Sequence, residues 1–101
     1  MSKYTKLYVD DIRNIPGEDW DLARNAWEAL YKLQNHKYDV VSLDHDLDSF
    51  IGDKEITGYD ITLWLVYRKQ QWLYTPTTIL VHSANPVGSK YMNNLIEKYL
   101  K

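Results

Sequence analysis

The sequence predicts one small α/β domain over residues 1–101, built on a short parallel sheet of three or four strands. Three short β-prone runs alternate with stretches of helical periodicity, and helical crossovers of this kind join parallel neighbours in a sheet. Each β-prone run also stops at polar residues suited to chemistry. We therefore expect a three-layer domain with helices on both faces, and a ligand site where the strands end.

The first strand is expected over residues 6–9, a β-prone run that stops at the acidic pair Asp10 and Asp11. Apolar residues then recur at three- and four-residue spacing from 21 to 34, which predicts an amphipathic helix with Trp27 in the core. The first few residues of this stretch also suit an edge strand.

The second strand is expected over residues 38–43, which are mostly apolar and run into Asp44, His45 and Asp46. Residues 48–57 are expected to form a loop. Gly58 then precedes a helix predicted over residues 59–72, whose inward side chains are expected to be Ile61, Trp64, Leu65 and Tyr67.

The third strand is expected over residues 77–81 and delivers His82 and Ser83. Asn85 and Pro86 then favour the start of a closing helix over residues 86–101. One stripe of that helix carries Tyr91, Leu95 and Tyr99. Before the strand, Trp72 and Tyr74 flank a loop, where we expect them to pack at the rim rather than to stack on a base.

Composition excludes several classes of function. The chain has no cysteine, which rules out disulfides, cysteine-ligated zinc and thiolate nucleophiles. A net charge of -2 argues against extensive nucleic-acid binding, which needs many Lys and Arg, but it is compatible with a small phosphorylated ligand. With no signal-peptide pattern and no apolar run near 20 residues, we expect no membrane association and a cytoplasmic location.

The acids at the strand ends indicate a metal site. Asp10, Asp11 and Asp44 would crowd carboxylates at adjacent strand ends, and a cation between them would relieve their repulsion. Oxygen ligands without cysteine suit Mg²⁺ or Mn²⁺. The alternative is that these acids cap helices or pair with Arg13 and Arg24.

The remaining polar residues suit acid–base chemistry and anion binding. His45 and His82, with Asp46 beside them, are candidate catalytic groups because imidazole exchanges protons near neutral pH. Arg13 and Arg24 are candidates for phosphate binding, although surface ion pairs would explain them equally. Ser83 and Asn85 precede a predicted helix start, where backbone N–H groups meet anions, but either residue would also serve as the helix cap.

Four motifs together resemble the cyclic-phosphate-processing receiver domain family, a divergent branch of the receiver-like (flavodoxin-like) domains. The motifs span residues 7–13, 42–47, 57–60 and 82–88. The resemblance implies an acidic metal pocket at Asp10 and Asp11, with Asp44 at the position that receivers phosphorylate. It also adds Gly58 to the substrate-binding residues, and it implies a short second strand within residues 20–25.

The same resemblance separates this chain from an ordinary receiver. His45 and Asp46 follow Asp44, His82 precedes the usual Ser or Thr, and no final strand carries a Lys. We therefore expect a metal-dependent phosphodiesterase that acts on a cyclic phosphate or cyclic nucleotide, in a role such as phage counter-defence in the bacterial or infected-host cytosol. The alternatives are a module that sequesters such a signal without turnover, helped by homo-oligomer formation, and a receiver-like switch phosphorylated at Asp44.

Overall fold

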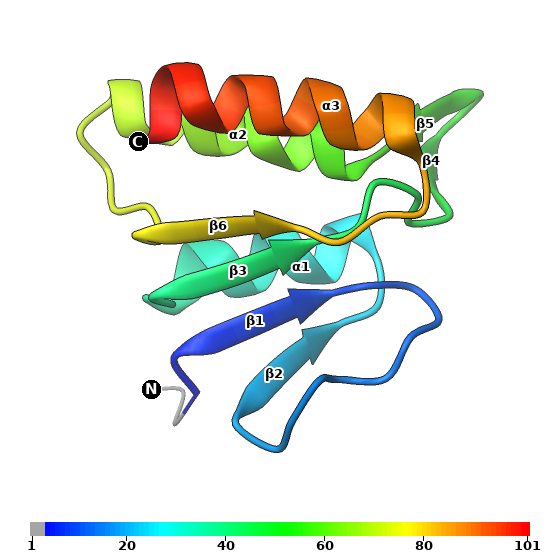
Figure 1. Ribbon diagram of the computed structural model, residues 1–101, viewed down its shortest axis with the longest axis horizontal. Helices are drawn as coiled ribbons and strands as arrows, with labels where there is room; N and C mark the ends of the chain where they lie inside the picture. The colour runs from blue at the N-terminus through cyan, green and yellow to red at the C-terminus, as the bar shows by residue number, and fades with distance from the viewer. Residues whose placement is uncertain (1–3) are drawn as a thin grey trace.

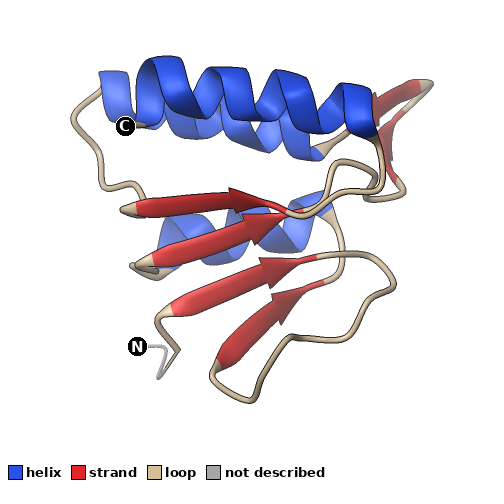
Figure 2. Cartoon of the chain, in the orientation of Figure 1, coloured by secondary structure: helices blue, strands red, loops and turns tan. Residues whose placement is uncertain are grey.

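The computed structural model describes residues 4–101, whose main elements form a twisted sheet packed against three helices (Figure 1). The elements of the sheet and its crossovers, in chain order, are β1 (Lys6–Val9), β2 (Trp20–Ala23), α1 (Ala26–Asn35), β3 (Val40–Leu43), α2 (Gly58–Gln70), β6 (Thr78–Val81) and α3 (Pro86–Leu95). A hairpin of β4 (Ser49–Ile51) and β5 (Lys54–Ile56) stands apart from the sheet (Figure 2).

The four strands of the sheet are all parallel and lie in the order β2-β1-β3-β6. Val9 pairs with Ala23 on one side and with Leu43 on the other, and Leu43 pairs with Val81, so the four strands end level. This confirms the receiver-like α/β fold with a short parallel sheet. The residues that follow β1, β3 and β6 consequently meet at one edge.

The second strand changes the prediction for residues 21–34. Residues 20–23 form β2 beside β1, and the helix begins only at Ala26, so the expected helix start at residue 21 is wrong. Asn25 caps the helix, since its side chain accepts a hydrogen bond from the backbone N–H of Glu28 (2.8 Å). The apolar periodicity does extend into the helix, but the helix begins only after residue 23, because residues 20–23 pair with β1 and Asn25 forms the cap.

The expected loop over residues 48–57 is instead a β-hairpin. Its two-residue turn is Gly52-Asp53, and Gly52 has a φ of +58°, the conformation that the first residue of a type II′ turn requires. Ser49 ties the hairpin to α1, because its hydroxyl accepts a hydrogen bond from the backbone N–H of Ala26 (3.0 Å). The hairpin therefore projects beside the carboxyl ends of the strands (Figure 1).

The three helices pack against one face of the sheet, so the expected three layers are wrong and the domain has two. Leu7, Val9, Val41 and Leu43 point to one face, where they join a single core with buried side chains of all three helices. That core includes Ala29 and Leu33 of α1, Ile61 and Leu65 of α2, and Met92 of α3.

The opposite face carries no helix among the described residues, and α1 lies behind the sheet in Figure 1. On this bare face Leu80 is 47% exposed, while Tyr8 and Ser42 are buried. The two-layer architecture arises because the connection from β1 to β2 is a loop and because the sheet has no strand after β6.

Several aromatic side chains lie elsewhere than expected. Trp27 is 45% exposed and Tyr67 is 59% exposed, so neither belongs to the core. In the last helical segment, the buried stripe is formed by Met92, Ile96 and Leu100, while Tyr91 and Tyr99 are exposed. Trp72 is 96% exposed after the end of α2, so rim packing is wrong for that residue. Among residues 4–101 no helix has the length and apolar character to cross a bilayer.

Candidate functional site

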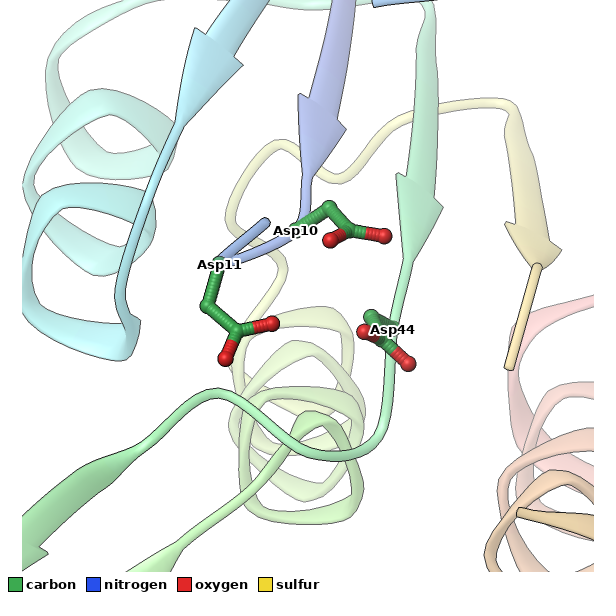
Figure 3. Close-up of side chains that lie close together, drawn as sticks. All are labelled: Asp10, Asp11 and Asp44. Atoms are coloured by element: carbon green, nitrogen blue, oxygen red, sulfur yellow. The ribbon is translucent and has the colours of Figure 1, made fainter. Parts of the chain in front are cut away.

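The strand ends bring three carboxylates together. Asp10 and Asp11 follow β1, Asp44 follows β3, and one oxygen of each lies within 4.8 Å of the others (Figure 3). This is the set that the sequence predicts to hold a cation. Burial and the nearby Asp10 carboxylate raise the pKa of Asp44, because hydrogen bonds from His45 and Ser83 offset them only in part. The cluster is therefore short of positive charge, and its all-oxygen donor set fits a hard cation such as Mg²⁺ or Mn²⁺.

Asp10 is fixed by its own loop. Its Oδ1 accepts hydrogen bonds from the backbone N–H groups of Ile12 (2.9 Å) and Arg13 (2.8 Å), which close a tight turn directly after β1. Burial raises the pKa of Asp10, but these two bonds and the interaction with His82 outweigh burial and lower it below the ordinary value. Asp10 is fully buried, and the two backbone N–H groups hold its charged carboxylate in place.

His82 reaches Asp10 from the end of β6, across the intervening strand β3. Its Nε2 lies 3.0 Å from Asp10 Oδ2, and its Nδ1 lies 2.6 Å from the hydroxyl oxygen of Ser42. The carboxylate only accepts hydrogen bonds, so Nε2 carries the proton and Nδ1 accepts from Ser42. Burial lowers the pKa of His82 more than Asp10 raises it, which keeps the imidazole neutral. With both nitrogens engaged, the geometry favours a positioning role over the predicted proton transfer.

His45 is held differently and keeps one nitrogen free for chemistry. Its Nδ1 lies 2.7 Å from Oδ1 of Asp46, so the carboxylate orients the ring and Nδ1 donates to it. The ring packs on Gly88 at the start of α3 so closely that a β-carbon there would overlap it. Nε2 is then the ring nitrogen that makes no hydrogen bond to any of residues 4–101. A carboxylate-oriented imidazole is the arrangement of a general base.

The two arginines divide between the ligand site and its support. Arg13 lines the site, and its Nη1 lies 3.8 Å from Asp10 Oδ2 and 3.3 Å from the carbonyl oxygen of His82. Arg24 instead donates from Nη1 to the carbonyl oxygens of Arg13 (2.6 Å) and Asp10 (3.3 Å). Arg24 thus braces the loop after β1 from behind, and the geometry favours Arg13 as the residue facing a phosphate.

Ser83 and Asn85 shape the start of α3. The Asn85 side chain accepts a hydrogen bond from the backbone N–H of Gly88 (2.9 Å), so Asn85 is the helix cap that the sequence offered as its alternative role. The Ser83 hydroxyl accepts a hydrogen bond from the backbone N–H of Asn85 (3.1 Å) and also contacts Asp44. Ser83 therefore connects the third strand end to the acidic cluster.

Gly58, a predicted substrate-binding residue, has a structural role at the start of α2. It is buried, its backbone N–H donates to the carbonyl oxygen of His45 (2.8 Å), and a β-carbon would overlap the carbonyl oxygen of Asp44. The residue is a glycine because α2 begins in direct contact with the end of β3. Its capping neighbour Thr57 forms a capping box with Asp60, which fixes where that helix begins.

Residues of the segment from Asp44 to Asp46 line two cavities. The first, which we call the acidic cavity, has a volume of about 200 Å³ and is lined by Asp11, Ile12, Arg13, Asp44, Asp46 and Ala84. The second, the aromatic cavity, has a volume of about 340 Å³ and is lined by His45, Thr57, Tyr59 and Tyr91. The acidic cavity includes Asp11, Arg13 and Asp44 from the predicted metal and phosphate residues, whereas no sequence pattern indicated the aromatic cavity.

Two residues that support the site, Tyr8 and Ser42, were not predicted from the sequence. The Tyr8 ring stacks on His82, and the Ser42 hydroxyl fixes its Nδ1. The signal that points to them is the period of two in a strand: Tyr8 precedes Asp10 by two residues, and Ser42 precedes Asp44 by two. Both residues therefore lie on the same face of the sheet as the acids. The residue two positions before a functional acid at a strand end is consequently a candidate for supporting the site.

Comparison with known families identifies a family for this chain. A model of the Cyclic-phosphate processing Receiver domain matches residues 5–98, which includes every residue of both cavities. Comparison with curated proteins finds no match. Comparison with solved structures also finds none.

Proposed function

Because the chain belongs to the cyclic-phosphate processing receiver domain family, we propose that it is a metal-dependent phosphodiesterase that opens a cyclic phosphate. The substrate would be a 2′,3′-cyclic phosphate end or a cyclic mono- or dinucleotide signal. The observation that carries this proposal is the carboxylate cluster of Asp10, Asp11 and Asp44 beside the oriented pair His45 and Asp46. A charged cluster and a positioned base are the two parts that phosphoester hydrolysis needs.

Each residue has a defined task in this proposal. A cation such as Mg²⁺ or Mn²⁺, held by Asp10, Asp11 and Asp44, would supply positive charge for the phosphoryl oxygens and activate water. Arg13 neutralises phosphate charge from the wall of the acidic cavity. Ser83 and His82 hold Asp44 and Asp10 in place.

The proton balance runs through His45. Its free Nε2 takes a proton from the attacking water as the new P–O bond forms. The same nitrogen then returns that proton to the ribose oxygen released when the ring ester bond breaks. The net reaction consumes one water and leaves a phosphate ester with a free hydroxyl. Asp46 stabilises the imidazolium between the two transfers.

The test incubates the purified protein with Mn²⁺ or Mg²⁺ and a panel of 2′,3′-cyclic nucleotides and cyclic dinucleotides, with the products separated by chromatography. We expect metal-dependent cleavage that His45→Ala abolishes. His36→Ala is the matched control, because His36 caps the far end of α1 and lies outside both cavities. If every nucleotide is recovered intact while one is retained by the protein, the hydrolase is wrong and the site sequesters its ligand.

The role of His82 needs a separate readout. A positioning residue acts through Asp10, so His82→Ala is expected to weaken cation binding without shifting the pH profile of the remaining activity. A shifted profile would instead make His82 a proton-transfer group.

We further propose that the protein acts in bacterial or phage-infected cytosol, where clearance of a cyclic nucleotide alarm signal would counter a host defence.

The rival function of a phosphorylated switch lacks a key group. Receivers carry a Lys at the end of a further strand, and within residues 4–101 the parallel sheet ends at β6. Asp44 is buried, and the acidic cavity is lined by no Lys. Labelling with acetyl phosphate is therefore expected to leave Asp44 unmodified.

A further inference from the structure

Apart from His45, the residues that line the aromatic cavity have no role in the chemistry described above, yet the same chain segment lines both cavities. His45 lines the aromatic cavity, while its neighbours Asp44 and Asp46 line the acidic one. A ligand whose phosphate lies beside the acids therefore has a second, differently built cavity within one residue of its reacting group. This arrangement suits a ligand with a charged end and a flat, uncharged end.

The walls of the aromatic cavity are rings. Tyr59 and Tyr91 meet edge to face, with their centroids 6.4 Å apart and their planes at 78°, and the imidazole of His45 supplies a third ring. The remaining lining residue is Thr57, so no Asp, Glu, Lys or Arg among residues 4–101 lines the cavity. Two rings set nearly at right angles present a face for stacking and an edge for a lateral contact.

The exposure of Tyr91 is not explained by packing. Met92, its neighbour in α3, is fully buried in the core, while Tyr91 is 56% exposed. Gly88 and Tyr91 are three residues apart and so share one face of α3. Gly88 contacts the His45 ring and Tyr91 lines the cavity, so one face of α3 contributes to both walls of the aromatic cavity.

We propose that the aromatic cavity is a nucleobase subsite, in which the base of the ligand stacks on Tyr91 and meets the edge of Tyr59. The volume of about 340 Å³ lies within the range of small-ligand sites. Stacking on tyrosine is tolerant of base identity, because every base has a π face. The inference rests on the proposed function for where the phosphate lies, and it narrows the substrate class to nucleotides rather than cyclic phosphates in general.

The experiment separates base from phosphate with three probes: adenosine, adenosine 2′,3′-cyclic phosphate, and glycerol 1,2-cyclic phosphate, which has the same ring phosphate and no base. Ring proton signals of the tyrosines are followed by NMR as adenosine is added, and affinities of the two cyclic phosphates are compared among variants in the presence of Mn²⁺. The variants are Tyr91→Ala, Tyr91→Phe and, as the matched control, Tyr99→Ala, which removes another exposed tyrosine of the same C-terminal helical segment.

We expect adenosine to shift the signals of Tyr59 and Tyr91 and to leave those of Tyr31 and Tyr99 unchanged. Tyr91→Ala should weaken the adenosine cyclic phosphate about tenfold, the usual size of one lost base stack, and leave the glycerol compound unchanged. Tyr91→Phe should behave as the wild type, because stacking needs the ring and not the hydroxyl.

The subsite is overturned if adenosine moves neither tyrosine signal, or if Tyr91→Ala weakens both cyclic phosphates equally. Failure of the proposed function has a different signature: glycerol cyclic phosphate neither binds nor reacts, while adenosine still shifts Tyr59 and Tyr91. In that case the subsite stands as a nucleoside site without cyclic-phosphate chemistry.

Discussion

The His82 ring lies face to face on the Tyr8 ring, with the centroids 4.1 Å apart and the planes 7° apart. Tyr8 lies in β1 and His82 follows β6, so the stack bridges β3 and connects two strand ends that do not pair with each other. Trp20 of β2 meets Tyr8 edge to face at 5.8 Å. Below the site, the bare face of the sheet is thus covered by the rings of Trp20, Tyr8 and His82 rather than by a helix.

Removal of the Tyr8 ring should loosen the site and the fold together. Tyr8→Ala is expected to cost about 3 kcal/mol in free energy of unfolding, because a buried ring and its stack on His82 are both lost. Tyr8→Phe keeps the ring and loses only the hydroxyl contact with Arg13, so its cost should be about 1 kcal/mol or less. Urea denaturation measures both. Equal losses in the two variants would mean that the stack itself contributes nothing.

Neutralising Asp44 should separate stability from cation binding. Without metal, Asp44→Asn removes a buried charge next to Asp10 and should therefore raise the free energy of unfolding. Saturating Mn²⁺ should raise the melting temperature of the wild type and leave that of Asp44→Asn unchanged. Asp48→Asn is the control, because it removes one exposed charge nearby and Asn tolerates the φ of +48° found there. A wild type indifferent to Mn²⁺ would argue against the metal site.

The glycine at the start of α2 should be intolerant of any side chain. In Gly58→Ala the new β-carbon would overlap the carbonyl oxygen of Asp44 and lie 2.8 Å from Cε of Met92, at a cost of about 3 kcal/mol. Gly52→Ala makes the same chemical change where nothing lies within 4 Å, so only its φ of +58° opposes alanine, at about 1 kcal/mol. Chemical denaturation of the two variants gives the comparison. A smaller loss for Gly58→Ala than for Gly52→Ala would show that the close approach is dispensable.

The stability of the protein should depend on pH through Asp21. Burial raises the pKa of Asp21, but hydrogen bonds from the Tyr38 hydroxyl (2.6 Å) and the Lys32 ammonium (3.0 Å) outweigh it and lower the pKa. A carboxyl with a lowered pKa in the folded state stabilises at pH values above its unfolded pKa of about 4, and this stabilisation disappears as the pH falls through the folded value.

Asp21→Asn should therefore cost about 1 to 2 kcal/mol at pH 7 and progressively less in acid, as measured by urea denaturation across the pH range. Asp19→Asn is the counterpart: its ion pair with Lys6 is exposed, so little change is expected. A pH-independent penalty for Asp21→Asn would mean that the lost contact does not depend on its charge.

The elements predicted well from the sequence are those determined locally. Each strand of the predicted trio is a short β-prone run, and its end is marked by the next polar residue, which explains why Asp10, Asp44 and His82 were placed at one edge. The start of α1 was not determined locally, because residues 21–23, which follow the helical period, pair with β1 as part of β2 instead. In the hairpin, the Gly52-Asp53 turn was the available signal, and its flanking runs of three residues are too short for a clear alternation.

Tertiary contacts explain the rest of the difference. No local pattern states that all helices fall on one face, because that depends on which connections lack a helix and where the sheet stops. The two hydrogen bonds of the His82 ring join it to Ser42 and Asp10, which lie 40 and 72 positions away along the chain. The sequence pattern identified the chemical groups of the site. Long-range hydrogen bonds determine which of the two histidines keeps a ring nitrogen without a hydrogen-bond partner among residues 4–101, and this is His45 rather than His82.

The loop after β1 is held by hydrogen bonds from two sides: the Asp10 carboxylate accepts from backbone N–H groups, and the Arg24 guanidinium donates to two carbonyl oxygens. The loop therefore loses its conformational entropy when the protein folds. Binding of a ligand in the acidic cavity then carries little further entropy cost for ordering this loop. Affinity at this site is then governed by charge and desolvation, and recognition should proceed without rearrangement of the main chain.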